Sequence, residues 1–119
     1  MEKKIDERTF EFALEIVDLY KYMIKNKEYV LSKQVLRSGT SIGANVHEAQ
    51  AAQSKADFIS KMSIASKEAR ETKYWLRLLD QSDYLDDYKK KDTILDNVNS
   101  IINIITKIVK TSSNPKPKT

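Results

Sequence analysis

Apolar residues recur at alternating intervals of three and four positions along four segments of the chain, the spacing that places side chains on one face of an α-helix. The first segment covers about residues 6–25. Its predicted core-facing stripe consists of Phe10, Ala13, Val17, Tyr20 and Ile24. Acidic residues gather early in this segment and lysines late, an order that complements the helix dipole. The polar run at residues 26–28 predicts the first break between helices.

Two further segments, about residues 30–52 and 54–81, predict a closely connected pair of helices. The stripe of the first consists of Leu31, Val35, Ser38, Ile42, Val46 and Ala49. The stripe of the second is an a/d heptad repeat that consists of Phe58, Met62, Ala65, Ala69, Thr72, Leu76 and Leu79. Ser54, followed three residues later by Asp57, approximates a capping box and therefore predicts the start of this longer helix.

The connection between these two helices is very short, because only a residue or two near Gln53 separates them. We therefore expect an antiparallel hairpin. Its register places Ser38 opposite Ala69 and Arg37 opposite Glu71. Every facing layer along the shared seam is then apolar or small, which supports the register.

The fourth segment runs from just after Leu85 to about Lys110, with Asp86 as its predicted N-cap. Its seam consists of Ile94, Val98, Ile101, Ile105 and Ile108. Further apolar residues widen this face to about half of the circumference: Leu95, Ile102, Ile104 and Val109. The many isoleucines would also suit a strand, but polar residues that recur at helical spacing favour a helix. The polar, proline-containing residues 112–119 predict a disordered tail.

The composition limits the fold to helices. The chain of 119 residues contains two glycines and two prolines, too few for the many turns of a β-sandwich or an α/β fold. We predict an all-α protein, an antiparallel up-down-up-down four-helix bundle over residues 1–111. No apolar run reaches the ~20 residues of a membrane-spanning helix, and no apolar signal segment opens the chain. These features predict a cytoplasmic protein without a membrane partner.

No constellation of residues predicts an enzyme. Cysteine is absent, which excludes a thiolate nucleophile and a zinc–thiolate site. The one histidine, His47, has Ala44 three residues before it, so the Glu-x-x-His pairs of a di-iron bundle cannot form. We interpret His47 as a solvated surface residue. Gly39 and Gly43 lack the lysine and the preceding strand of a phosphate loop, and close helix packing explains them better. We predict no catalytic residue, metal or cofactor.

A polar stripe runs beside the apolar stripe of the second predicted helix. It consists of Gln34, Arg37, Ser41, Asn45 and Glu48. It can serve as a ligand or partner surface, or as a hydrogen-bonded network at a helix boundary. Because Arg37 faces Glu71 in the expected register, we favour a structural network. Its predicted members are Arg37, Ser41, Asn45, Glu48 and Glu71. The sequence leaves open whether the network lies inside one bundle or between subunits.

A basic stripe lies on the third predicted helix. It consists of Lys67, Arg70, Lys73 and Arg77, with Tyr74 among them and Trp75 nearby. Basic and aromatic residues interleaved in this way suit the backbone and bases of a nucleic acid. The alternative is a solvated face in which Lys67 pairs with Glu71. The chain carries 21 basic and 17 acidic residues, a net charge of +4, which is too small an excess to decide between the two.

The predicted helices carry more apolar surface than one small bundle can bury. The excess lies on the wide face of the fourth helix and on a second ridge of the third helix, formed by Ile64, Trp75 and Leu78. Exposed patches of this size indicate association. We therefore predict a homo-oligomer.

The motif-rich middle of the chain resembles a known bacterial family. The resemblance is carried by LRSGTSIGANV at residues 36–46 and EAQAAQSK at 48–55, and it continues through DFI at 57–59 and YWL at 74–76. The family comprises four-helix-bundle proteins first noticed as reading frames within intervening sequences of 23S ribosomal RNA genes. The residues that match its motif as structural or interface positions are Arg37, Ser38, Ser41, Asn45, Glu48 and Glu71.

The resemblance implies a helical bundle that assembles into homopentamers, and it marks no catalytic residue. A branch with a similar fold, the accessory variability proteins of diversity-generating retroelements, presents a basic surface and works with a reverse transcriptase and its RNA. We therefore expect a non-enzymatic homo-oligomer associated with RNA or DNA, RNA being favoured, with a reverse transcriptase as a candidate partner. The alternative is an oligomeric scaffold that binds a protein partner and no nucleic acid.

Overall fold

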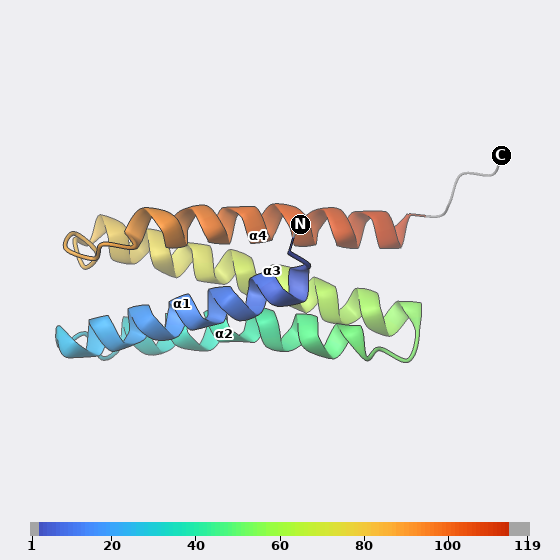
Figure 1. The fold of residues 1–119 in the computed structure, drawn as a ribbon, viewed down its shortest axis with the longest axis horizontal. Coiled ribbons are helices and arrows are strands. Elements are labelled where there is room, and N and C mark those ends of the chain that lie inside the picture. The colour runs from blue at the N-terminus through green and yellow to red at the C-terminus, as the bar shows by residue number, and fades with distance from the viewer. Residues whose placement is uncertain (1–2, 115–119) are drawn as a thin grey trace.

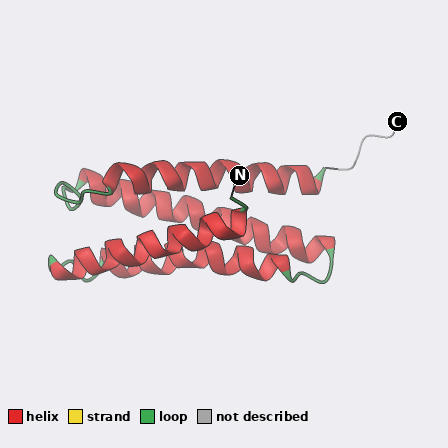
Figure 2. Ribbon diagram, in the orientation of Figure 1, coloured by secondary structure: helices red, strands yellow, loops and turns green. Residues whose placement is uncertain are grey.

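The computed structural model describes residues 3–114 and contains four α-helices: α1 (Ile5–Lys25), α2 (Leu31–Gln50), α3 (Lys55–Gln81) and α4 (Lys91–Ser113). Each helix packs against the next in sequence, and α4 returns to α1 with a smaller contact (Figure 1). Loops are confined to the ends of the bundle (Figure 2). The predicted all-α antiparallel bundle is confirmed.

The core lies along the bundle axis, where the predicted stripes of α2, α3 and α4 meet. It includes two facing hydroxyl groups: Ser38 Oγ and Thr72 Oγ1 lie 2.9 Å apart, and Thr72 also donates to the Glu68 carbonyl oxygen. Ser38 thus reaches Thr72, one helical turn beyond the expected Ala69. The fully buried apolar side chains of these three helices are Val35, Ile42, Val46, Met62, Ala65, Ala69, Leu76, Leu79, Ile94, Val98 and Ile105.

The predicted core stripe of α1 is wrong. Phe10 is 65% exposed, and the other members of that stripe are only partly buried. The face that enters the core consists instead of Thr9, Phe12, Ile16, Leu19 and Met23. Helix α1 carries two apolar ridges with the same spacing, so periodicity alone could not choose between them. Contacts with α2 decide the rotation of the helix.

Two glycines of α2 allow α1 to approach closely. A methyl group added to Gly39 would lie 2.7–2.9 Å from side-chain carbons of Ile16. A methyl group on Gly43 would lie 3.1 Å from the backbone oxygen of Thr9. Ile16 and Thr9 therefore pack where α2 has no side chain, which explains why α1 turns this ridge inward. The expected role of the glycines in close packing is present in the structure.

Polar side chains accept hydrogen bonds from backbone N–H groups at the starts of α2 and α3. Glu28 is buried after α1, and its carboxylate accepts hydrogen bonds from the backbone N–H groups of Val30 and Ser32 at 3.3 and 2.7 Å. A carboxylate at this position complements the N-terminal end of the α2 dipole. At α3 the predicted cap is present, because Ser54 Oγ accepts from the Asp57 N–H at 3.0 Å.

The predicted start of α4 is wrong, because the loop after α3 extends through Lys90 and Asp86 does not cap the helix. Leu85 and Tyr88 in this loop are buried in the core. Tyr88 Oη donates to Asp18 Oδ2 at 2.7 Å, which holds the loop against α1. This hydrogen bond holds the pKa of Asp18 below its ordinary value. Because Leu85 and Tyr88 pack into the core from a loop, α4 begins at Lys91 and not directly after Leu85.

The far end of the chain departs from the expected boundary. Helix α4 continues through Ser113, so residues 112 and 113 are helical rather than part of a disordered tail. Residues 115–119 of that predicted tail lie outside the described part of the chain. Among residues 3–114 no helix is both long enough and apolar enough to cross a membrane.

Candidate nucleic-acid interface

Three of the four predicted basic residues surround a shallow hollow between α3 and α4. The hollow has a volume of about 260 Å³ and is lined by Arg70, Lys73, Tyr74, Arg77 and Ile102. Arg70 forms a hydrogen bond to α4, in which its Nη2 donates to Thr106 Oγ1 at 3.1 Å. Lys67 is exposed on α3 one turn before Arg70 and does not line the hollow. The structure therefore assembles a compact group of three cations, with a fourth beside it.

These cations make no close ion pair with a carboxylate in the part of the chain that the structure describes. None of the four forms a salt bridge there. The pair between Lys67 and Glu71, which the solvated-face alternative requires, is absent among these residues. The Glu71 carboxylate instead contacts Arg37 on α2. The hollow is thus bordered by positive charge that short-range ion pairs leave uncompensated.

An aromatic pair adjoins the hollow. Tyr74 is 59% exposed, and its ring meets Trp75 edge to face, with ring centroids 5.2 Å apart. Trp75 is partly buried, and its Nε1–H donates to Glu71 Oε2 at 3.1 Å. This hydrogen bond, followed by the Arg37 contact, lowers the pKa of the Glu71 carboxyl. The polar boundary between α2 and α3 is therefore connected to the ring that lines the hollow.

Only part of the predicted polar network crosses between helices. The Arg37 guanidinium contacts Glu71, as the register predicted, and also Glu68 at 3.3 Å. Ser41 and Asn45 instead donate to carbonyl oxygens of their own helix, one turn earlier. Periodicity places polar residues on one face, but a short side chain can bond its own backbone there and never reach the neighbouring helix.

At the far end of this boundary, Glu48 contacts Lys61 at 3.5 Å, so the stripe makes two separate cross-helix contacts rather than one network. Both contacts join α2 to α3 of the same chain.

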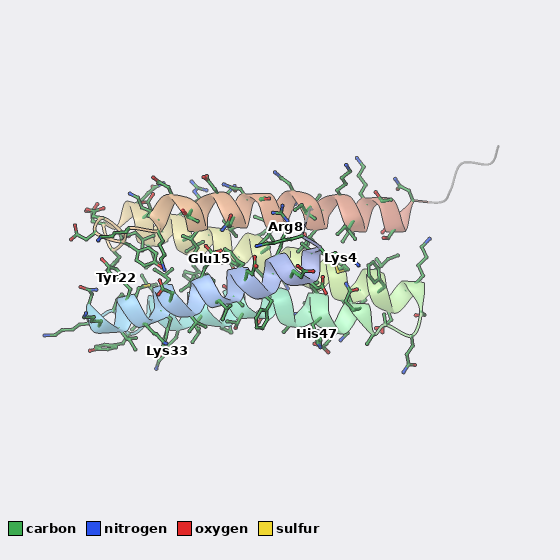
Figure 3. All side chains as sticks on the ribbon, in the orientation of Figure 1. Lys4, Arg8, Glu15, Tyr22, Lys33 and His47 are labelled. Carbon is green, nitrogen blue, oxygen red and sulfur yellow. The ribbon has the colours of Figure 1, made fainter. Side chains whose placement is uncertain are left out.

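A second hollow, which the sequence prediction missed, lies between α1 and α2. It has a volume of about 670 Å³ and is bordered by exposed Phe10 and His47, with Gly43 and Ala44 between them. Acidic side chains of α1 complete its rim: Asp6, Glu7 and Glu11. In Figure 3 His47 lies at the outer side of α2. The hollow was missed because Phe10 had been placed in the core.

No group of three or more potential metal-binding side chains occurs within the described residues.

Across the bundle, Arg8 and Glu15 of α1 are labelled in Figure 3 on the side that faces α4. Glu15 accepts from Asn97 Nδ2 at 2.8 and 3.0 Å, and Arg8 approaches Ser100 at 3.5 Å. These contacts join two helices and do not form a site.

Comparison with known proteins places this arrangement in a family. Residues 1–107 match the family model described as 23S rRNA-intervening sequence protein. The chain belongs to this family. A crystal structure of a protein with unknown function from the S23 ribosomal protein family of Bacteroides thetaiotaomicron is similar, with 47% sequence identity and a TM-score of 0.85. The match covers 90% of this chain and 99% of that one. No curated protein matches the chain.

Proposed function

We propose that this member of the 23S rRNA-intervening sequence protein family is a non-enzymatic homo-oligomer that binds nucleic acid, with RNA as the favoured ligand. One observation carries the proposal: Arg70, Lys73 and Arg77 converge on one hollow without a carboxylate partner among the described residues. Cations left unpaired in this way are available to phosphate groups, whose neutralisation releases counterions.

The resemblance to accessory variability proteins supports the same direction. Those proteins present a basic surface and work with a reverse transcriptase and its RNA. We extend this relationship to the present chain as part of the proposal, with a reverse transcriptase as a candidate partner. The basic stripe of α3 is the surface that would correspond to theirs.

Assembly would strengthen a weak site. A pentamer would carry a formal charge of about +20, five times that of one subunit. Several copies of the hollow in one particle would also engage one long strand together, so that apparent affinity rises without any new contact per subunit. A net charge of only +4 per chain is then compatible with useful binding.

Replacing Arg70 and Arg77 together with glutamate tests the site. We expect binding of labelled RNA to weaken across all sequences while the oligomer stays intact. For a short single strand that occupies one hollow and makes three phosphate contacts there, the logarithm of affinity should fall against that of salt with a slope of about −2. The matched control replaces two exposed lysines elsewhere, Lys21 and Lys33, with glutamate and changes the charge equally.

Two outcomes would contradict the proposal. One is the absence of binding by the wild-type protein at low salt, and the other is equal loss of affinity in the control and test variants. The protein-scaffold alternative would then lead. It has its own observation, the hollow beside exposed Phe10 between α1 and α2, which suits an apolar side chain of a partner.

A further inference from the structure

The side chain at the centre of the basic stripe is aromatic rather than charged. Tyr74 follows Lys73 directly and lies about one helical turn from both Arg70 and Arg77. It lines the same hollow as these three cations, and more than half of its surface is open to solvent. Phosphate contacts need no aromatic ring, whereas an exposed ring among cations offers a face on which a base can stack.

The ring is held in place before any ligand arrives. Trp75 supports Tyr74 edge to face, with a centroid distance of 5.2 Å and an interplanar angle of 75°. Trp75 is in turn held by its hydrogen bond to Glu71, and Glu71 is held by Arg37. A ring fixed in this way loses little freedom when a base stacks on it, so more of the stacking energy contributes to affinity.

We propose that the hollow binds single-stranded nucleic acid, with one unpaired base stacked on Tyr74 and neighbouring phosphates on Arg70, Lys73 and Arg77. This inference rests on the proposed function and specifies its ligand. In a duplex both faces of a base are covered by neighbouring bases, so a duplex could use the cations but not the ring. The small volume of the hollow, about 260 Å³, also suits one unit of a flexible strand better than the side of a duplex.

The chain provides its own optical probe of this event. Trp75 is the single tryptophan of the sequence and contacts Tyr74. We therefore expect a single-stranded oligouridine of about 12 nucleotides to quench tryptophan fluorescence as it binds. An RNA duplex of equal length should bind the full-length protein at least about fivefold more weakly at low salt, because it lacks the stacking contribution.

Two variants separate stacking from charge. Tyr74→Leu should weaken binding of the single strand about fivefold or more and leave duplex binding unchanged, whereas Tyr74→Phe should bind like wild type because the ring remains. Tyr74 is largely exposed, so both variants should keep the wild-type melting temperature. The Arg70→Glu and Arg77→Glu double variant should instead weaken binding of both ligands.

The results that overturn the inference differ from those that overturn the proposed function. Equal wild-type affinity for single strand and duplex, or an unchanged affinity of Tyr74→Leu for the single strand, would show that the cations bind phosphates without stacking. Nucleic-acid binding would then stand and the single-strand preference would fall. No binding of either ligand would overturn both.

Discussion

At the scale of single residues, the exposure of Arg37 determines what its ion pair is worth. The Arg37 side chain is 51% exposed although its guanidinium contacts two carboxylates, Glu68 and Glu71. A pair in this position is screened by water, so its net contribution is small. The pair is therefore a local support for the hairpin rather than a buried charge cluster on which folding depends.

We predict that Arg37→Ala lowers the free energy of unfolding at pH 7 by about 1 kcal/mol or less. The pKa of Glu71 is lowered in the folded protein, first by Trp75 and then by Arg37. The Glu71 carboxylate therefore stabilises the fold when the pH is above its ordinary pKa. This stabilisation is lost as the pH falls through the lowered pKa of the folded state. Urea unfolding at pH 7 and pH 4 checks this, and a larger loss at pH 4 would contradict it.

Glu15 shows the opposite linkage. Burial raises its pKa, and the hydrogen bond from Asn97 offsets only part of that effect. Because the pKa is raised in the folded protein, this group stabilises the fold when the pH is below its ordinary, unfolded pKa. That stabilisation is lost as the pH rises through the raised pKa of the folded state. At pH 7 the charged carboxylate therefore opposes folding.

We predict that Glu15→Gln is more stable than wild type at pH 7 by less than about 1 kcal/mol, a rise of up to about 5 °C in melting temperature. The amide keeps an oxygen that can accept from Asn97 and removes the charge. The difference should shrink by pH 4, where the wild-type side chain is largely protonated. Thermal unfolding at both pH values measures it, and a less stable variant at pH 7 would show that the charged hydrogen bond outweighs burial.

At the scale of helices, hydrophobic spacing predicted the existence of all four elements, but not the rotation of α1. Its two ridges, one through Phe10 and one through Phe12, have equivalent periodicity. The choice depends on Gly39, where the absence of a side chain admits Ile16. The start of α4 was missed for a similar reason, because the burial of Tyr88 in a loop depends on Asp18, 70 residues away in the sequence.

Gly39→Ala tests this account of α1. The added methyl group would overlap Ile16, which is fully buried and branched at Cβ and therefore cannot turn aside easily. Overpacking of this kind costs about 1–3 kcal/mol, against a gain of ~1 kcal/mol in helix propensity, so we expect a net loss of stability.

In an Ile16→Ala background the same substitution should be neutral or stabilising, because the space is then free. A double-mutant cycle from urea unfolding measures this coupling. Additive effects of the two substitutions would mean that Ile16 and Gly39 do not set the approach of α1 to α2.

The candidate nucleic-acid interface, like the helices, was only partly predictable from the sequence. Helical spacing alone grouped Lys67, Arg70, Lys73 and Arg77, because residues on one helix keep their relative positions. Lys67 lies outside the hollow because the position of the hollow also depends on α4, whose Ile102 helps to line it. Spacing on one helix cannot show what a neighbouring helix adds, and for the same reason Ser41 and Asn45 were placed in a network that their short side chains do not join.

At the scale of the whole molecule, exposed apolar side chains lie on the predicted ridge of α3 and also on α1, where the sequence did not indicate them. Much of the wide face of α4 is used inside the bundle, where Ile94, Val98, Ile101, Ile102 and Ile105 are buried. The ridge of α3 retains some exposure at Ile64 and Leu78. The largest exposed apolar side chains of α1 are Phe10 and Leu14, at 65% and 57%, and Phe10 borders the hollow between α1 and α2.

We predict that assembly uses the exposed apolar residues of α1. An oligomer that buries Phe10 and Leu14 would remove apolar area from water, the main driving force of association. The α1 surface lies away from the hollow between α3 and α4, so assembly there would leave the basic residues accessible. The ridge of α3, by contrast, lies on the helix that carries those residues.

We predict that the wild-type protein is an oligomer, a pentamer of about 68 kDa, and that replacing Phe10 and Leu14 together with glutamate dissociates it. Multi-angle light scattering at micromolar concentration measures both masses. A matched control replaces two exposed apolar residues of the α1–α2 turn, Tyr29 and Val30, with glutamate and should leave the oligomer intact. Dissociation by Ile64→Glu with Leu78→Glu, but not by the α1 variant, would move the interface to the ridge of α3. A wild-type mass near 13.7 kDa would refute assembly itself.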